Sequence, residues 1–234
     1  MSKRTIEVAI LKISATRALE PYEAAVIRGS LGRMFSDEPL LHHHLENKLL
    51  YTYPKVQFKI IEGIAHIIGI EEGISVINNI KTKISKLKLE RNKIELCDPE
   101  ITIKNEKFGS TDNLHKYIFA TIWMALNSAN YQKYISSSKE EDILRLTLIG
   151  NILSMCKGLG YIVKDDLKIS LDLKEVPTSL KGTPMLGFLG TFSVNFEIPD
   201  YWGIGKSVSR GFGTVKRISS EEAHGSYSQQ KKAF

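Results

Sequence analysis

The chain has 234 residues, with 32 lysines and arginines against 26 aspartates and glutamates, so its formal net charge is +6. This length suffices for one or two domains with a buried core, and the basic excess favours a polyanionic partner. The two cysteines, Cys97 and Cys156, are too few for a disulfide framework or a four-ligand zinc cluster. No apolar run reaches the length of a membrane span and no secretory signal is expected, so we predict a cytoplasmic protein without a membrane partner.

The first 98 residues follow the order strand, helix, hairpin, helix, strand, which is the βαββαβ pattern of a ferredoxin-like domain. The strands are recognised by β-branched residues and alternation, and the first helix by a proline suited to its first turn. The predicted elements are a strand over 5–13, a helix from Pro21 to Met34, hairpin strands over 51–60 and 64–70, a helix over 74–80, and a strand over 83–97.

Asp98-Pro99 is the predicted domain boundary, and residues 99–218 resemble a degenerate copy of the first half whose last helix is shortened or missing. The predicted elements are a strand over 116–123, a helix over 142–157 behind a capping box from Ser138 to Glu141, strands over 161–173 and 186–198, and a strand over 212–218. The polar tail, 219–234, is predicted to be disordered. The fold class is therefore α+β, with two tandem ferredoxin-like (RRM-like) domains.

A glycine-rich loop over 203–213 is the strongest chemical signal in the chain. Its glycines let a ligand approach the backbone, its cations and hydroxyls suit phosphate, and it holds no acidic residue. Successive backbone N–H groups in such a loop can form an anion-binding nest. The alternative is a plain turn with incidental charge. The candidate phosphate or RNA ligands are Gly203, Gly205, Lys206, Ser207, Ser209, Arg210, Gly211 and Gly213.

Arg28 is a further candidate for RNA binding. Gly29 and Gly32 lie three residues apart on the predicted first helix, where small side chains would let a nucleic acid approach, and Arg28 and Arg33 flank them. The alternative is a helix end whose arginines are solvated.

Three consecutive histidines, His42 to His44, precede the hairpin. In an extended segment His42 and His44 would point the same way and His43 the other. Two neutral imidazoles side by side suit acid–base cleavage of RNA, in which one withdraws the 2′-hydroxyl proton and the other protonates the departing 5′-oxygen. The alternatives are an exposed polar loop and an incomplete metal site.

Polar side chains alternate with apolar ones on the first hairpin strand. Val56, Phe58 and Ile60 share one face, and Tyr53, Gln57 and Lys59 lie on the other. A lysine near a phosphoryl transfer could offset the charge that develops on the phosphate, and a tyrosine could orient a base or donate to the phosphate. The alternative is the solvent side of an amphipathic strand.

Six segments spread over most of the chain form a combined motif. They are Ile27-Arg28-Gly29, His42-x-His44 with Tyr53-Pro54-x-x-Gln57-x-Lys59, Gly69-x-x-x-Gly73, Trp123-x-x-Leu126-Asn127, Ile149-Gly150-Asn151-Ile152-Leu153, and the glycine-rich loop. With these segments the chain resembles the CRISPR-associated repeat-processing endoribonucleases of the Cas-six family, especially its type I branch. The resemblance implies two ferredoxin-like domains and metal-independent, cofactor-free cleavage of precursor CRISPR RNA within its repeat. The 2′-hydroxyl attacks, leaving a 2′,3′-cyclic phosphate and a 5′-hydroxyl.

The resemblance also implies roles for individual residues. His42 and His44 become the acid–base pair, Tyr53 and Lys59 become supporting catalytic groups, and the glycine-rich loop becomes the RNA clamp. The histidine at position 43 departs from the family pattern and leaves open which imidazole is primary. The expected partners are CRISPR repeat RNA, other interference-complex subunits and a second copy of the chain. The alternatives are a repeat-RNA-binding subunit that does not cleave, and a general single-strand RNA-binding protein, which the scarcity of stacking aromatics disfavours.

Overall fold

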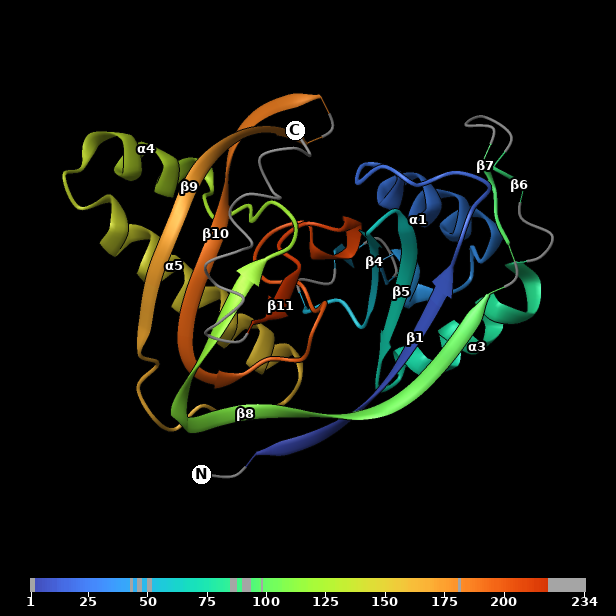
Figure 1. The fold of residues 1–234 in the computed structure, drawn as a ribbon, viewed down its shortest axis with the longest axis horizontal. Coiled ribbons are helices and arrows are strands. Elements are labelled where there is room, and N and C mark those ends of the chain that lie inside the picture. The colour runs from blue at the N-terminus through green and yellow to red at the C-terminus, as the bar shows by residue number, and fades with distance from the viewer. Residues whose placement is uncertain are drawn as a thin grey trace.

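The computed structural model describes residues 3–42, 44–45, 48–49, 52–84, 88–89, 94–97, 99–180 and 182–218. In the first half, four antiparallel strands form a sheet with two helices packed on one face (Figure 1). The elements of this half are β1 (Arg4–Ile13), α1 (Glu23–Met34), α2 (Pro39–His42), β2 (His44–Leu45), β3 (Lys48–Leu49), β4 (Val56–Ile61), β5 (Ile64–Ile70), α3 (Gly73–Lys83), β6 (Lys88–Leu89), β7 (Ile94–Glu95) and the start of β8 (Glu100–Phe119).

The order of these strands, β4-β5-β1-β8, is that of a ferredoxin-like sheet. The predicted strand over 83–97 is wrong: α3 continues to Lys83, and β6 and β7 form a separate two-stranded sheet. The fourth strand is the first half of β8, where Ile101 pairs with Leu11. Most side chains from 100 to 107 are exposed and polar, so this strand carried little apolar alternation for sequence analysis to detect.

The second half repeats the arrangement with strands in the order β11-β8-β10-β9, all antiparallel. Between its first and second strands this half has two helices, where a ferredoxin-like unit has one. Before its last strand it has only the short turn η3, in the glycine-rich loop, where such a unit has its second helix. Only one of the two helices, α5, was predicted. The elements are α4 (Ser128–Ser136), α5 (Glu140–Gly158), β9 (Ile169–Leu180), β10 (Thr183–Glu197), the 3₁₀ turn η3 (Val208–Arg210) and β11 (Val215–Arg217).

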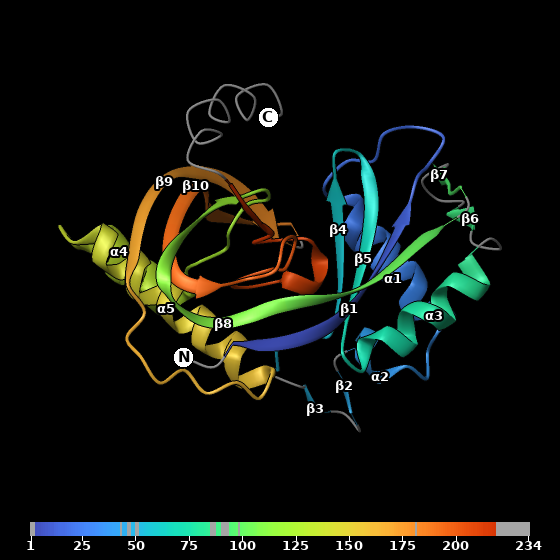
Figure 2. The ribbon, with the colours of Figure 1, turned by 60° about the horizontal axis from the view of Figure 1, so that its bottom comes forward.

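β8 joins the two halves because it serves both sheets, pairing first with β1 and then with β10 and β11 (Figure 2). It begins directly after the predicted boundary at Pro99. The two faces of β1 belong to different cores. Leu11 packs toward α1 and α3, whereas Val8 joins Phe108 and Trp202 in the core of the second half. The second domain therefore covers the face of the first sheet that carries no helices.

No helix within the described residues is long and apolar enough to cross a membrane. The predicted disordered tail, 219–234, lies outside the described residues.

Candidate functional site

The glycine-rich loop is a packed element between β10 and β11. Ile204 and Val208 are buried in the second core. The loop also closes on itself, because the Ile204 N–H donates to the Gly213 carbonyl at 2.8 Å. Its shape is therefore fixed before any ligand arrives, a property that favours preorganised binding.

Tyr53, just before β4, and two polar residues of β4 hold this loop from the first domain. The Tyr53 hydroxyl donates to the Gly203 carbonyl at 2.9 Å, the Gln57 Oε1 accepts from the Gly203 N–H at 3.0 Å, and the Lys59 Nζ donates to the Val208 carbonyl at 3.0 Å. Gln57 is fully buried and Lys59 is 1% exposed. The solvent-face interpretation of this strand is therefore wrong, because the second domain covers that face.

Tyr53 and Lys59, both predicted as catalytic, are thus buried and bonded to the loop backbone. Burial raises the pKa of the Tyr53 hydroxyl, against the opposing effects of its bonds to Gln57 and Gly203. Burial lowers the pKa of Lys59 to about 7, and the described residues place no carboxylate within ion-pair distance of its ammonium. The carbonyl of Val208 is the acceptor that compensates this charge.

The buried lysine gives a test of how the loop is held. Because the pKa of Lys59 in the folded chain, about 7, lies below its unfolded value of about 10.4, the unfolded chain binds an extra proton between these pH values. The free energy of unfolding should therefore rise with pH across this window, by up to about 1.4 kcal/mol per unit from this group. Denaturant unfolding from pH 7 to 9 is expected to show a shallower rise for Lys59→Met than for the unmodified chain. Parallel profiles would mean that Lys59 is not buried as described.

The second domain holds the loop from the opposite side. The Thr121 Oγ1 donates to the Gly211 carbonyl at 2.6 Å, and the Gly213 N–H donates to the Ile122 carbonyl at 2.8 Å. Lys206 donates from its Nζ to the Leu126 carbonyl at 2.8 Å, and its partial burial lowers the pKa of the ammonium. An ammonium has three donors, so this bond leaves Lys206 able to contact a phosphate as well.

Three successive backbone amides at the tip of the loop are unused. The N–H groups of Ser207, Val208 and Ser209 have no hydrogen-bond acceptor within the described part of the chain. Ser207 has φ +57° and precedes η3, a left-handed residue followed by right-handed ones, which turns neighbouring amides in one direction. Amides turned in this way are the arrangement from which an anion-binding nest is built, whereas Gly203, Gly211 and Gly213 are bonded within the protein.

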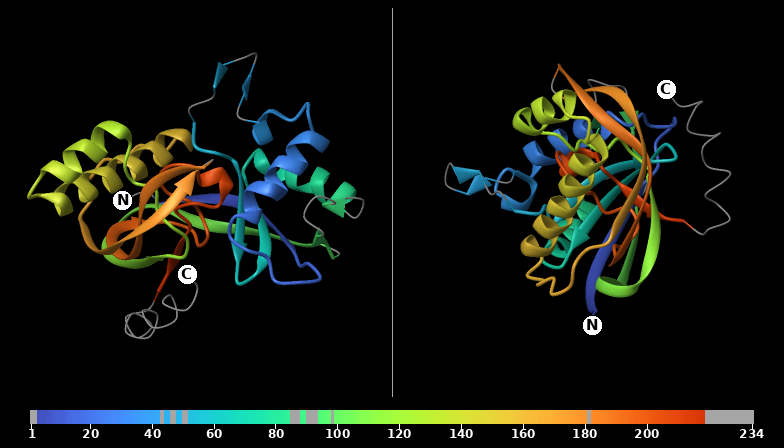
Figure 3. Two further views of the ribbon diagram at one scale, coloured as in Figure 1. Left: turned by 90° about the horizontal axis from the view of Figure 1, so that it is seen from above. Right: turned by 90° about the vertical axis from the view of Figure 1, so that its left-hand side faces the viewer.

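The turn η3, which includes Arg210, contacts the helix α1, which carries Arg28 (Figure 3). Arg28 is partly buried, and its pKa is lowered by burial and by the positive charge of Arg210. Neither arginine forms an ion pair with any described residue, and the buried Arg28 Nε lacks a hydrogen-bond partner. Two arginines that are close enough to affect each other's charge, and that form no ion pair with a described residue, suit an anion such as a phosphate.

Arg28 also contacts the chain just before the histidine segment. Its Nη2 donates to the carbonyl of Leu41 at 2.9 Å, and Leu41 directly precedes His42. His42 is the last residue of α2 and His44 is the first of β2, so the predicted extended segment is wrong at His42. His43 lies outside the described residues. Arg28 thus holds the backbone carbonyl of the residue that leads into His42.

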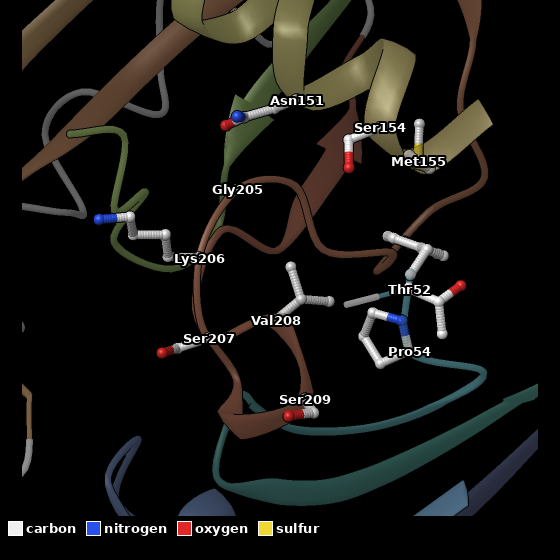
Figure 4. A pocket seen from close by; sticks show the side chains of 11 residues that line it. Thr52, Pro54, Asn151, Ser154, Met155, Gly205, Lys206, Ser207, Val208 and Ser209 are labelled. Carbon is white, nitrogen blue, oxygen red and sulfur yellow. The ribbon is translucent and has the colours of Figure 1, made fainter. Parts of the chain in front are cut away.

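Asn151, in α5, belongs to the site although it was not among the predicted site residues. With Ser154 it faces a cavity of about 430 Å³ between α5, the loop and residues 52–54 (Figure 4). The Asn151 Oδ1 accepts from the Trp123 Nε1 at 3.1 Å. Both residues lie in segments of the combined motif, which was the available signal, but sequence spacing alone does not show that they meet beneath Gly205.

Comparison with known proteins gives matches over nearly the whole described chain. Residues 4–107 match the Cas6b N-terminal domain model and residues 109–218 match the Cas6b C-terminal domain model. An uncharacterized protein of Methanocaldococcus jannaschii is 39% identical over 145 residues, which are 61% of this chain and 99% of that protein.

Two solved structures share this fold at similar identity. A crystal structure of Cas6b aligns with TM-score 0.83 and 39% identity, covering 91% of this chain and 100% of that one. A crystal structure of the CRISPR RNA processing endoribonuclease Cas6b aligns with TM-score 0.69 and 38% identity, with the same coverage.

Proposed function

The chain belongs to the Cas6b family, and from this membership and the site geometry we propose that it is an endoribonuclease that processes precursor CRISPR RNA by cutting within the repeat. The reaction needs no metal: the 2′-hydroxyl upstream of the scissile bond attacks the phosphorus, giving a 2′,3′-cyclic phosphate and a 5′-hydroxyl. His42 and His44 are the proposed acid–base pair.

The observation that carries this proposal is the position of Arg28. Its guanidinium bonds the residue before His42, and α1 contacts the η3 turn that carries Arg210, so a phosphate held by the two arginines would lie near the histidine segment. Such cations would also stabilise charge that develops on the phosphate oxygens during attack. The unused amides of Ser207 to Ser209 would hold the adjoining phosphate of the same strand.

Tyr53 and Lys59 have a different role in this proposal from the catalytic one predicted from sequence. Both are buried and bonded to loop carbonyls. They therefore support the reaction as positioning residues, which fix the loop backbone relative to the first domain. Gln57 completes the set through the Gly203 N–H. RNA then contacts the loop and the arginines, and does not contact β4.

Incubation with repeat RNA in EDTA tests the reaction class. We expect cutting of an all-ribose repeat and none of a copy in which the upstream 2′-hydroxyl is replaced by hydrogen, with a 2′,3′-cyclic phosphate on the product. Cutting of the deoxy copy, or a strict need for divalent metal, would contradict the mechanism. Binding of both RNAs without cutting would instead indicate a repeat-binding subunit.

The loop cations give a second test. Lys206→Ala combined with Arg210→Ala should weaken repeat binding and lower the slope of log K against log salt concentration by about 0.7 for each phosphate that is no longer bound. Lys81→Ala combined with Lys83→Ala is a matched control, because it removes the same charge from α3, which packs on the opposite face of the first sheet. Equal slopes for the two double variants would exclude the loop cations as phosphate ligands.

A further inference from the structure

Two cavities, each of about 430 Å³, share Gly205, Lys206 and Asn151 in their lining. The first has Ser154 on its α5 wall, Thr52 and Pro54 opposite, and Ser209 at the far end (Figure 4). The second extends along α5 toward Asn130 and Lys133 of α4. The residues that line these two cavities include amides, hydroxyls and lysines but no carboxylate, and each cavity is within the size range of small-ligand pockets.

The amide of Asn151 is held in one orientation. An indole N–H can only donate, so its bond to Asn151 fixes the amide oxygen toward Trp123 and leaves the NH₂ group for a ligand. Gly205 packs directly over this pair: a Cβ at that position would lie 2.7 Å from the Trp123 Nε1 and 3.0 Å from the Asn151 Oδ1. Trp123 is fully buried, so the pair is enclosed by protein on the side away from the cavities.

An amide that can offer only N–H groups to a ligand favours a base edge that presents hydrogen-bond acceptors. Adenine places an amino group beside its N7, cytosine places one beside its N3, and uracil places its N3–H beside its O4, so each of these bases has a donor next to the acceptor that the amide would use. Guanine presents two adjacent acceptors, O6 and N7, on one edge. Single-stranded RNA is read through such base edges once the base is unstacked.

We propose that the cavity between α5 and the glycine-rich loop binds one unpaired guanine of the repeat RNA, and that Asn151 specifies it by donating from its Nδ2 to the guanine O6 or N7. This inference rests on the proposed function, because it assumes that repeat RNA crosses the loop. The amides of Ser207 to Ser209 lie along the same cavity and would hold the phosphate attached to this nucleotide. One nucleotide would thus be recognised through its base by Asn151 and held through its phosphate by the loop amides.

The test is an equilibrium binding scan with repeat RNA that carries hydrogen at the upstream 2′ position and therefore is not consumed. Each guanine is replaced in turn by adenine, which exchanges O6 for an amino group, or by inosine, which keeps O6 and N7. At one position we expect adenine to weaken binding about 10-fold and inosine to leave it nearly unchanged. A scan without such a position would overturn the assignment of guanine.

The variant Asn151→Asp reverses the polarity of the site. A carboxylate can still accept from Trp123, but it presents an acceptor where the amide presented donors. At the recognised position the preference should invert, so that cytosine or adenine binds more tightly than guanine in this variant. Asn130→Asp is the matched control, since it adds the same charge in the second cavity only and should weaken all RNAs by one common factor.

An unchanged guanine preference in Asn151→Asp would refute the role of Asn151. The outcomes separate this inference from the proposed function. RNA that binds with the expected guanine pattern but is never cut when all-ribose would support the guanine site and contradict the endoribonuclease proposal. All-ribose RNA that is cut, but binds without any base preference at the loop, would support the endoribonuclease proposal and contradict the guanine site.

Discussion

Replacing His42 or His44 with alanine is expected to slow single-turnover cleavage of repeat RNA about 100-fold or more while leaving RNA affinity nearly unchanged. The reason is that each imidazole is proposed to transfer a proton in the transition state, whereas binding depends on the loop and the arginines. Single-turnover rates and equilibrium binding, measured on the same RNA, separate the two effects. His43→Ala belongs in the same series, because the run of three histidines leaves the pairing open.

A modified substrate can identify which histidine is the acid. If the departing 5′-oxygen is replaced by sulfur, the leaving group needs little protonation, so the variant that lacks the acid should recover most of its rate and the variant that lacks the base should not. Unchanged rates in both His42→Ala and His44→Ala would exclude the histidine mechanism. A larger loss in His43→Ala than in either neighbour would reassign the pair.

The strand β4 shows what sequence reasoning could and could not determine. The alternation of apolar and polar residues correctly assigned Val56, Phe58 and Ile60 to one core. It could not show that a second layer covers the other face, because burial of Gln57 and Lys59 depends on residues about 150 positions later. Alternation reports the faces of a strand, but it does not report what each face packs against.

Local rules also failed where tertiary packing decided the outcome. Ser138 was the predicted cap of the second-domain helix, yet α5 starts after Lys139 without a side-chain cap, and Ser137 instead accepts from the Lys139 N–H. Conversely, α4 was not predicted, although Asn127 caps it through a bond from the Asn130 N–H. Its residues are mostly polar and only Tyr134 is buried, so the segment has no clear apolar periodicity.

The glycine-rich loop was identified correctly as a unit, but its glycines have a second role that composition does not reveal. A flexible loop and a packed loop can have the same glycine content. The hydrogen bonds from Tyr53, Gln57 and Thr121 show that both domains bind the backbone of the loop.

Gly213→Ala is expected to be the most damaging single-methyl substitution in the loop. Its φ of +63° already disfavours a side chain, and a Cβ would lie 1.9 Å from the Ile204 carbonyl oxygen. The left-handed conformation costs about 1–2 kcal/mol and the overlap adds about 1–3 kcal/mol. At about 2–4 °C per kcal/mol for a chain of this size, the melting temperature should fall by roughly 4–20 °C. Repeat binding should weaken as well, because Gly213 pairs with Ile204 and Ile122 to close the loop.

Gly160→Ala separates the two contributions, since Gly160 has nearly the same φ, +64°, but its nearest contact to an added Cβ would be the Arg4 Nη1 at 3.9 Å. This control should show the conformational cost alone and leave RNA affinity unchanged, because Gly160 follows α5 outside the loop. If the two variants lowered the melting temperature equally, the carbonyl of Ile204 would have room to move and the loop would be softer than its hydrogen bonds indicate. A Gly213→Ala variant that bound repeat RNA normally would show that the packed shape of the loop is not what the RNA recognises.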